Sequence, residues 1–203
     1  MARAIKVDDP ARERMLSAAV EIIIEEGYYR ASSNHIAKRA GVSWGAIQHH
    51  FGSREQLLLQ VVHAGTLSLI SSLKSARITG EGIEERLESL ADAVWRCYRR
   101  PDFLASMEIL LNLTKEPRTS ADTIEELAAT ERQVSELWHG LVDQAVPAEH
   151  RRPELGGVVF QLIRGLAIGS NLLDAIPQAN KTSDDRQARD VLVKSLSLYI
   201  GGI

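Results

Sequence analysis

The hydrophobic pattern of the chain has the period of an α-helix over most of its length. Near the start, apolar residues recur at Leu16, Ala19, Val20, Ile23 and Ile24, which is the i, i+3, i+4, i+7, i+8 spacing of one helix face. The strict alternation of apolar and polar residues that indicates β-strands is nearly absent. We therefore expect an all-α protein with about nine helices.

Local start and stop signals divide this pattern into separate helices. Asp9 is the expected cap of the first helix, Pro10 its first residue and Gly27 its end. Serine caps predict three further helix starts, at Ser32, Ser43 and Ser53. The segments expected to be helical are 10–26, 32–40, 43–50, 53–73, 83–98, 103–114, 120–145, 153–176 and 184–200.

Residues 32–51, SSNHIAKRAGVSWGAIQHHF, carry the most information in the chain. Two short helices meet at 40–42, where Ala37 must be small because the helices cross close to it, and Gly41 supplies a positive φ. This pattern predicts a helix-turn-helix whose second helix enters the major groove of DNA. A plain αα-hairpin, which can occur in any helical protein, is the alternative. The residues expected to fill the wedge between the helices are Ile36, Val42 and Ile47.

Composition indicates an ordinary folded chain. Hydrophobic residues make up 44% of the 203 residues and the formal net charge is −3, so intrinsic disorder is not expected. The longest apolar runs are too short to cross a bilayer, and the first residues do not resemble a signal peptide. A single cysteine, Cys97, cannot form an intrachain disulfide. We therefore expect a soluble cytoplasmic protein that does not enter the membrane.

The net charge hides an uneven distribution along the chain. Residues 1–54 hold 8 Lys plus Arg and 6 Asp plus Glu, whereas residues 55–203 hold 16 and 21. The stretch 27–54 contains Arg30, Lys38, Arg39 and Arg54 and no acidic residue. A short basic stretch on a mildly acidic body is what a small DNA-contacting module would give, although chance can also produce it.

The residues around the motif sharpen the prediction. Characteristic stretches occur at fixed spacings: Glu26-Gly27-Tyr28, Ile36-Ala37, Ala40-Gly41-Val42-Ser43, Gly45, His50-Phe51 and Ser53-Arg54-Glu55-Gln56-Leu57-Leu58. With these stretches, residues 11–62 resemble the tetracycline-repressor (TetR) family of bacterial transcriptional regulators. The rest of the chain resembles that family in length and helical content.

The resemblance implies a three-helix DNA-binding domain over residues 10–55, with its helix-turn-helix at 32–51. A linking helix at 53–76 then leads to a larger ligand-binding and dimerisation domain at 77–203. The implied function is sequence-specific regulation of transcription, by a repressor that a small, largely apolar effector releases from a palindromic double-stranded DNA operator. The implied assembly is a homodimer through 153–176 and 184–200.

Helix geometry and the resemblance together predict the DNA-facing residues. They are Asn34, Ser43, Trp44, Gly45, Ala46, Gln48, His49, His50 and Arg54. Gln48 stands where the family most often has a tyrosine that contacts the DNA backbone. Because glutamine can bond adenine bidentately, we hypothesise that Gln48 reads a base. Arg54 begins a helix, where backbone N–H groups favour a phosphate.

Other residues near the motif have two readings. Lys38 and Arg39 are equally consistent with contacts to the DNA backbone and with a solvated helix face. Trp44 can contact a thymine methyl or pack against the first helix. His49 and His50 are adjacent on a helix and cannot both reach one metal ion, so no metal site is expected there.

The second domain gives two weaker predictions. Small residues make the segment 153–176 suited to close helix packing, either in a dimer interface with residues 191–199 or in an internal contact: Gly156, Gly157, Gly165, Ala167, Gly169 and Ser170. The residues expected to supply an effector pocket are Trp95, Phe103, Met107, Leu110, Trp138 and Phe160. We expect two or three of them to line it and the others to be core.

Catalytic signatures are weak. Ser71-Ser72-Leu73-Lys74 matches an S-x-x-K string without its companion motifs, and no phosphate-binding glycine loop is present. We therefore expect neither enzymatic activity nor a cofactor. Two other classes remain as alternatives: a helical small-molecule-binding protein without operator binding, and a small helical enzyme.

Overall fold

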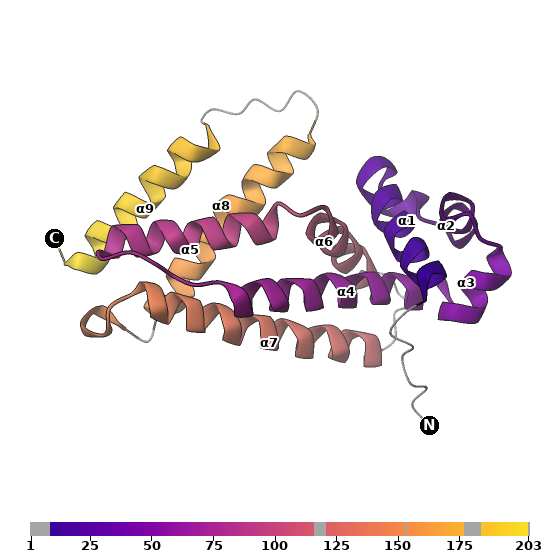
Figure 1. Ribbon diagram of the computed structural model, residues 1–203, viewed down its shortest axis with the longest axis horizontal. Coiled ribbons are helices and arrows are strands. Elements are labelled where there is room, and N and C mark those ends of the chain that lie inside the picture. Colours follow the sequence, from indigo (N-terminus) through magenta and orange to yellow (C-terminus); the bar gives the residue numbers. More distant parts are fainter. Residues whose placement is uncertain (1–8, 116–120, 153, 177–183, 203) are drawn as a thin grey trace. The chain divides into compact units, whose positions relative to one another are not determined.

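The computed structural model describes residues 9–115, 121–152, 154–176 and 184–202 (Figure 1). Every regular element within these residues is a helix, as predicted. The α-helices are α1 (Pro10–Glu26), α2 (Ser33–Ala40), α3 (Trp44–Phe51), α4 (Arg54–Ser75), α5 (Ile83–Tyr98), α6 (Pro101–Leu113), α7 (Ala121–Ala145), α8 (Leu155–Ala175) and α9 (Asp185–Gly201). Two short 3-10 helices, Tyr28–Arg30 (η1) and Ala148–His150 (η2), were not expected from the sequence.

The predicted caps are confirmed. The Asp9 carboxylate accepts a hydrogen bond from the Ala11 N–H at 3.0 Å, and Pro10 begins α1. Each predicted serine cap accepts from an N–H three residues on: Ser32 from His35 at 3.3 Å, Ser43 from Ala46 at 3.2 Å and Ser53 from Gln56 at 3.1 Å. Gly41 ends α2 with φ +66°, the left-handed conformation that its place in the turn requires.

Two helix starts differ from the prediction. Helix α6 begins at Pro101 rather than Phe103, because proline is well suited to the first helical position and so starts the next helix as well as ending the last. Pro153, the expected start of the eighth helix, lies outside the described residues, as does Ser120 at the expected start of the seventh. Helix α8 begins at Leu155.

The chain divides into two compact units, and the division differs from the expected boundary at residue 77. The N-terminal unit comprises Met1–Thr66 and Pro101–Leu127, and the second unit comprises Leu67–Arg100 and Ala128–Ile203. Helix α6 therefore belongs with the DNA-binding motif. Its inner face explains this, because Ala105, Ile109 and Leu113 are fully buried in the same core as α1 and α4.

The core of the N-terminal unit is continuous across its helices. Ile36 and Ile47 are buried and Val42 packs against them, as the predicted wedge requires. Helix α4 approaches α6 closely at Gly65, where an added Cβ would lie 2.7 Å from the Ser106 hydroxyl oxygen. A side chain larger than hydrogen at Gly65 would thus force Ser106 to move.

The second unit is organised around α5, which packs against α8 and α9. Trp138 of α7 lies fully buried between two aromatic rings, with ring centroids 5.8 Å from Tyr98 and 5.0 Å from Phe160. The Arg164 guanidinium lies over the rings of Tyr98 and Phe160, at 5.6 and 5.5 Å from their centroids. Within the described residues, Trp138 Nε1 has no hydrogen-bond partner.

Two helices are longer and more apolar than the short apolar runs in the sequence suggested. Arg54–Ser75 and Leu155–Asp174 are long and apolar enough to cross a membrane by length and composition. The same test is passed by core helices of soluble proteins, and α4 buries Leu57, Leu58 and Val61 in the core of the N-terminal unit.

Candidate nucleic-acid interface

Helix α3 has one buried side and one open side. Ile47 and Phe51 are buried against the N-terminal core, while the Ser43 hydroxyl caps the start of the helix. Trp44 and Gln48, one turn apart, are exposed, and 53% of the Trp44 surface is open to solvent. Of the two readings of Trp44, packing against α1 is therefore not what the structure shows.

The other residues of the motif that were predicted to face DNA differ in how exposed they are to solvent. Asn34, Ser43, Gly45 and His49 are exposed, and Ala46 is half-buried. Gly45 has room for a methyl group, because an added Cβ would have the Ser43 hydroxyl oxygen at 3.7 Å as its neighbour. Ser43, Gly45 and Ala46 thus lie at the start of α3, whereas His49 lies in its last turn and Asn34 in the first turn of α2.

Arg39 is held by carboxylates of α1. Its guanidinium lies 2.9 Å from Glu25, 3.0 Å from Glu26 and 3.6 Å from Glu21. The hydrogen bond to Glu25 is the main cause that raises the pKa of Arg39 above its usual value. Lys38, one residue earlier, is exposed and forms no ion pair within the described residues. Lys38 rather than Arg39 is thus available for a DNA phosphate.

Arg54 has an internal role that sequence reasoning missed. Its guanidinium donates hydrogen bonds to the carbonyl oxygens of Ala31 at 2.8 Å and Tyr28 at 2.9 Å, and to the Tyr28 hydroxyl at 3.3 Å. It also lies over the Tyr28 ring, 4.4 Å from the centroid. The Arg54 side chain therefore anchors η1 to the start of α4, and its predicted phosphate contact stays a prediction.

His50 is also engaged within the unit. Its Nδ1 lies 3.5 Å from Asp9 Oδ2, while the Asp9 carboxylate caps α1. This pair connects the last turn of α3 to the residue that caps α1. The predicted contact between His50 and DNA would have to share that side chain with Asp9.

Glu108 of α6 is a second residue that sequence reasoning missed. Its Oε1 accepts a hydrogen bond of 2.6 Å from the backbone N–H of Tyr28. Tyr28 follows Gly27, whose φ of +91° turns the chain out of α1 into η1. Glu108 thus binds the backbone N–H of Tyr28, whereas Arg54 binds its carbonyl oxygen and hydroxyl. The contact spans 80 residues, so no local sequence signal could have revealed it.

Comparison with known proteins agrees with this geometry. A family model described as bacterial regulatory proteins of the tetR family matches residues 15–61, which cover most of α1, all of α2 and α3, and the start of α4. Over these residues the chain matches the TetR family. This confirms the resemblance inferred from the motif and the prediction of a helix-turn-helix transcriptional regulator.

Two curated relatives are named as transcription regulators, and a solved structure shares the fold. The transcriptional activator FasR of Mycolicibacterium smegmatis is 34% identical over 85 residues, which are 42% of this chain and 39% of FasR. The transcriptional regulator CymR of Pseudomonas putida is 21% identical over 159 residues, which are 77% of each chain. The structure of FadR from Bacillus subtilis in complex with stearoyl-CoA has a TM-score of 0.64 at 15% identity, covering 91% of this chain and 97% of FadR.

The six residues predicted for the effector pocket are divided between the two units. Phe103, Met107 and Leu110 are half-buried on α6, in the N-terminal unit. Trp138 and Phe160 form the buried stack of the second unit. Trp95, also in the second unit, lines a pocket.

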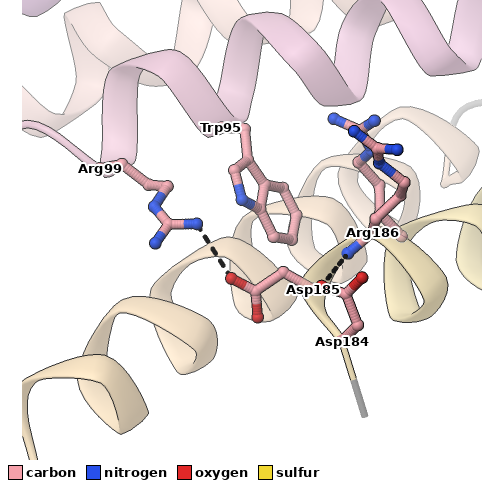
Figure 2. A pocket seen from close by; sticks show the side chains of 6 residues that line it. Trp95, Arg99, Asp184, Asp185 and Arg186 are labelled. Carbon is pink, nitrogen blue, oxygen red and sulfur yellow. Dashed lines mark hydrogen bonds and ion pairs between the residues drawn. The ribbon is translucent and has the colours of Figure 1, made fainter.

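That pocket has a volume of about 350 Å³ and is strongly charged. It is lined by Trp95, Arg99, Asp184, Asp185, Arg186 and Arg189, and we call it the ion-paired pocket (Figure 2). Arg99 lies 2.9 Å from Asp185 and 2.7 Å from Asp174, and Arg189 forms an ion pair with Asp92. Because five of its six lining residues are charged, this pocket is a poor match to the largely apolar effector that was expected.

The small residues of α8 have two kinds of surroundings. An added Cβ at Gly156 would lie 3.6 Å from the His139 ring, and Ala167 and Ser170 are buried. At Gly157, Gly165 and Gly169, an added Cβ would meet no atom within 4 Å in the described residues. The internal-contact interpretation therefore applies to Gly156, Ala167 and Ser170. The other small residues, Gly157, Gly165 and Gly169, face open space in a single copy.

Proposed function

We propose that this TetR-family chain is a homodimeric repressor in which two α3 helices enter successive major grooves of a palindromic operator. The observation that carries the proposal is the open side of α3, where Trp44 and Gln48 stand exposed on a helix held by buried Ile47 and Phe51. An exposed, rigidly supported side chain at the start of such a helix is what reading base edges requires.

The same proposal assigns the open face of α8 and α9 to the partner copy. Large apolar side chains are exposed on both helices: Val158, Leu162, Leu172, Leu173, Val191, Leu198 and Tyr199. Gly157, Gly165 and Gly169 lie open on α8, where small residues allow a second helix to approach closely. An exposed apolar face of this extent on a soluble chain indicates an interface with another protein.

Effector binding to the second unit completes the proposed mechanism. The neighbour FadR was solved with stearoyl-CoA, which supports a small-molecule ligand for a chain of this fold. By linkage, an effector that weakens operator binding is itself bound more weakly when the operator is present, with a coupling of about 1–3 kcal/mol. The proposed place of action is the cytoplasm, and the proposed role is binding without catalysis, as the relatives are named as regulators.

Selection of duplexes from a random DNA pool tests this function. We expect an enriched palindrome whose half-site centres lie about 10–10.5 base pairs apart, or a multiple of that spacing. Binding should weaken steeply as salt concentration rises, because phosphate contacts release counterions. Absence of an enriched duplex would instead support the alternative of a helical small-molecule-binding protein that does not bind an operator.

The sign of regulation needs a separate measurement, because the relative FasR is named as an activator. A reporter gene placed behind the selected operator should be expressed less when the chain is present. Higher expression in its presence would show an activator and contradict the repressor part of the proposal.

A further inference from the structure

The start of α3 exposes one large apolar side chain. The structure describes all of residues 32–51, and Trp44 is the only large hydrophobic side chain among them that is exposed. The bulky apolar side chains of α2 and α3 that pack inward, Ile36, Ile47 and Phe51, are buried in the core of the N-terminal unit. The Trp44 indole is not part of that core. Its open surface can therefore contact a ligand.

The residue after Trp44 leaves space beside the ring. An added Cβ at Gly45 would meet only the Ser43 hydroxyl oxygen, at 3.7 Å, and the φ of Gly45 is not in the left-handed region. Glycine destabilises a helix relative to alanine. Since neither a neighbouring atom nor the backbone requires glycine here, the fold does not account for it. A close approach of the α3 backbone to a bound molecule does.

The side chains of α3 favour A·T over G·C base pairs. The commonest specific base contact in the major groove is made by an arginine or lysine to guanine. Helix α3 contains neither residue type. Lys38 and Arg39 belong to α2, and the first helix of such a motif crosses the DNA backbone. The side chains that α3 exposes at its start and one turn later are an apolar ring, Trp44, and an amide, Gln48.

Thymine is the base that offers an apolar group to such a ring. Its 5-methyl group lies in the major groove, where apolar side chains contact it. An indole is large and rigid and carries one N–H donor at its edge, so most of its surface can cover a methyl group. The other contact open to an exposed indole is donation of that N–H to a phosphate oxygen, which carries no sequence information.

We propose that Trp44 is a specificity-determining residue and that its indole reads the 5-methyl group of a thymine in each half-site of the operator. This inference rests on the proposed function and extends it, because it assigns a chemical group of the DNA to one side chain. Gly45 lets the α3 backbone approach the base edges, which brings the indole against the methyl group. The affinity of the chain for its operator therefore depends on that methyl group.

Replacement of thymine by deoxyuridine isolates this contact, because it removes the methyl group and keeps the hydrogen-bonding edge. The duplex enriched from the random pool is remade with deoxyuridine at one thymine position at a time, and its binding to the full chain is measured by fluorescence anisotropy. At one position in each half-site, we expect binding to weaken about fourfold, and about 15-fold when both half-sites are changed, as burial of a methyl group predicts. The remaining thymines are internal controls.

Variants assign the methyl effect to Trp44. In Trp44→Ala, the thymine and deoxyuridine duplexes should bind equally. Trp44→Phe keeps an apolar ring without the N–H and should retain most of the difference. Gln48→Ala, on the same face of α3, is the matched control and should keep the full ratio between the two duplexes, whatever its overall affinity. Comparison of ratios between variants cancels any effect of deoxyuridine on the DNA itself.

Several results would overturn the proposal. They are an enriched half-site without thymine, binding that no deoxyuridine substitution weakens, a methyl effect that persists in Trp44→Ala, and an equal loss of that effect in Gln48→Ala. If the indole N–H instead donates to a phosphate, Trp44→Phe should weaken every duplex as much as Trp44→Ala does. Circular dichroism melts of the Trp44 variants should match the unmodified chain, because the indole lies outside the core.

The same experiment separates this inference from the proposed function. Absence of any enriched duplex would overturn both, because there would be no operator to read. An enriched palindrome that binds equally well with thymine and with deoxyuridine at every position would leave the DNA-binding function intact and overturn only the methyl contact.

Discussion

The two compact units differ in how completely one copy of the chain covers its apolar surface. In the N-terminal unit, α1–α4 and α6 bury a continuous core, and the large apolar side chains that stay exposed are spread over different elements: Ile24, Tyr29, Trp44, Leu111 and Ile124. In the second unit, α8 and α9 leave a series of large apolar side chains exposed. The exposed apolar side chains of the second unit are what the proposed dimer through α8 and α9 would cover.

The largest expected effect breaks the interface of the second unit. Leu172 of α8 is 60% exposed, and Leu172→Glu would place a charge inside the proposed dimer. We expect a monomer by light scattering and a loss of operator affinity of about 100-fold or more, because one copy reads one half-site. Leu67→Glu is the matched control, since Leu67 is 56% exposed on α4. If both variants remain dimers, the proposed interface through α8 is wrong.

The next effect tests whether the N-terminal unit is stabilised from within. Arg54→Ala removes the donors to the Tyr28 and Ala31 carbonyls and should lower the free energy of unfolding by about 2–4 kcal/mol. The free energy of unfolding of Arg54→Lys should lie between those of Arg54→Ala and the unmodified chain, because an ammonium cannot reproduce the planar fork of the guanidinium. Arg39→Ala, which removes partly exposed ion pairs, should be clearly milder in the same denaturant titration. Unchanged stability with weakened operator binding in Arg54→Ala would restore its predicted phosphate contact as its main role.

A third variant tests the placement of α6 in the N-terminal unit. Glu108→Leu leaves the Tyr28 N–H without its acceptor and should cost about 1–3 kcal/mol of unfolding free energy. Glu108→Gln keeps a carbonyl acceptor and should cost less. Thermal unfolding followed by circular dichroism measures both. Equal stability of all three chains would show that the hydrogen bond between Glu108 and the Tyr28 N–H adds little to the stability of this unit.

The smallest effect concerns the open side of α3. If Gln48 reads an adenine, Gln48→Ala should remove about 1–3 kcal/mol of discrimination at one base-pair position of each half-site. Lys38→Ala should instead weaken all duplexes alike and reduce the slope of log affinity against log salt by about 0.9 for each phosphate that Lys38 neutralises. Competition binding on duplexes with single substitutions distinguishes the two. A uniform loss in Gln48→Ala would reject base reading.

Local chemistry made the helices and the motif predictable. Asp9, Ser32, Ser43 and Ser53 cap helices because a side-chain oxygen meets an N–H two or three residues away, a relation visible in sequence. Gly41 was equally readable, since its turn requires a positive φ. The start of α6 at Pro101, two residues before the expected start at Phe103, was not recognised.

The interactions that shape the site were not predictable in the same way. Arg54 is 26 residues from Tyr28 and Glu108 is 80 residues from it, so their hydrogen bonds depend on how α4 and α6 pack. The sequence placed Arg54 at a helix start, where a phosphate contact is the usual expectation. For Arg39, spacing could not show that three carboxylates of α1 lie within reach.

The positions of the three tryptophans have a practical consequence for optical measurements. Trp44 stands exposed at the start of α3, whereas Trp95 and Trp138 are buried in the second unit. A chain that keeps Trp44 and carries phenylalanine at the other two positions should emit at the long wavelengths of a hydrated indole, and contact with DNA should quench that emission. A chain that keeps Trp138 should emit at shorter wavelengths until the second unit unfolds. One fluorophore type can thus report docking in one unit and melting in the other.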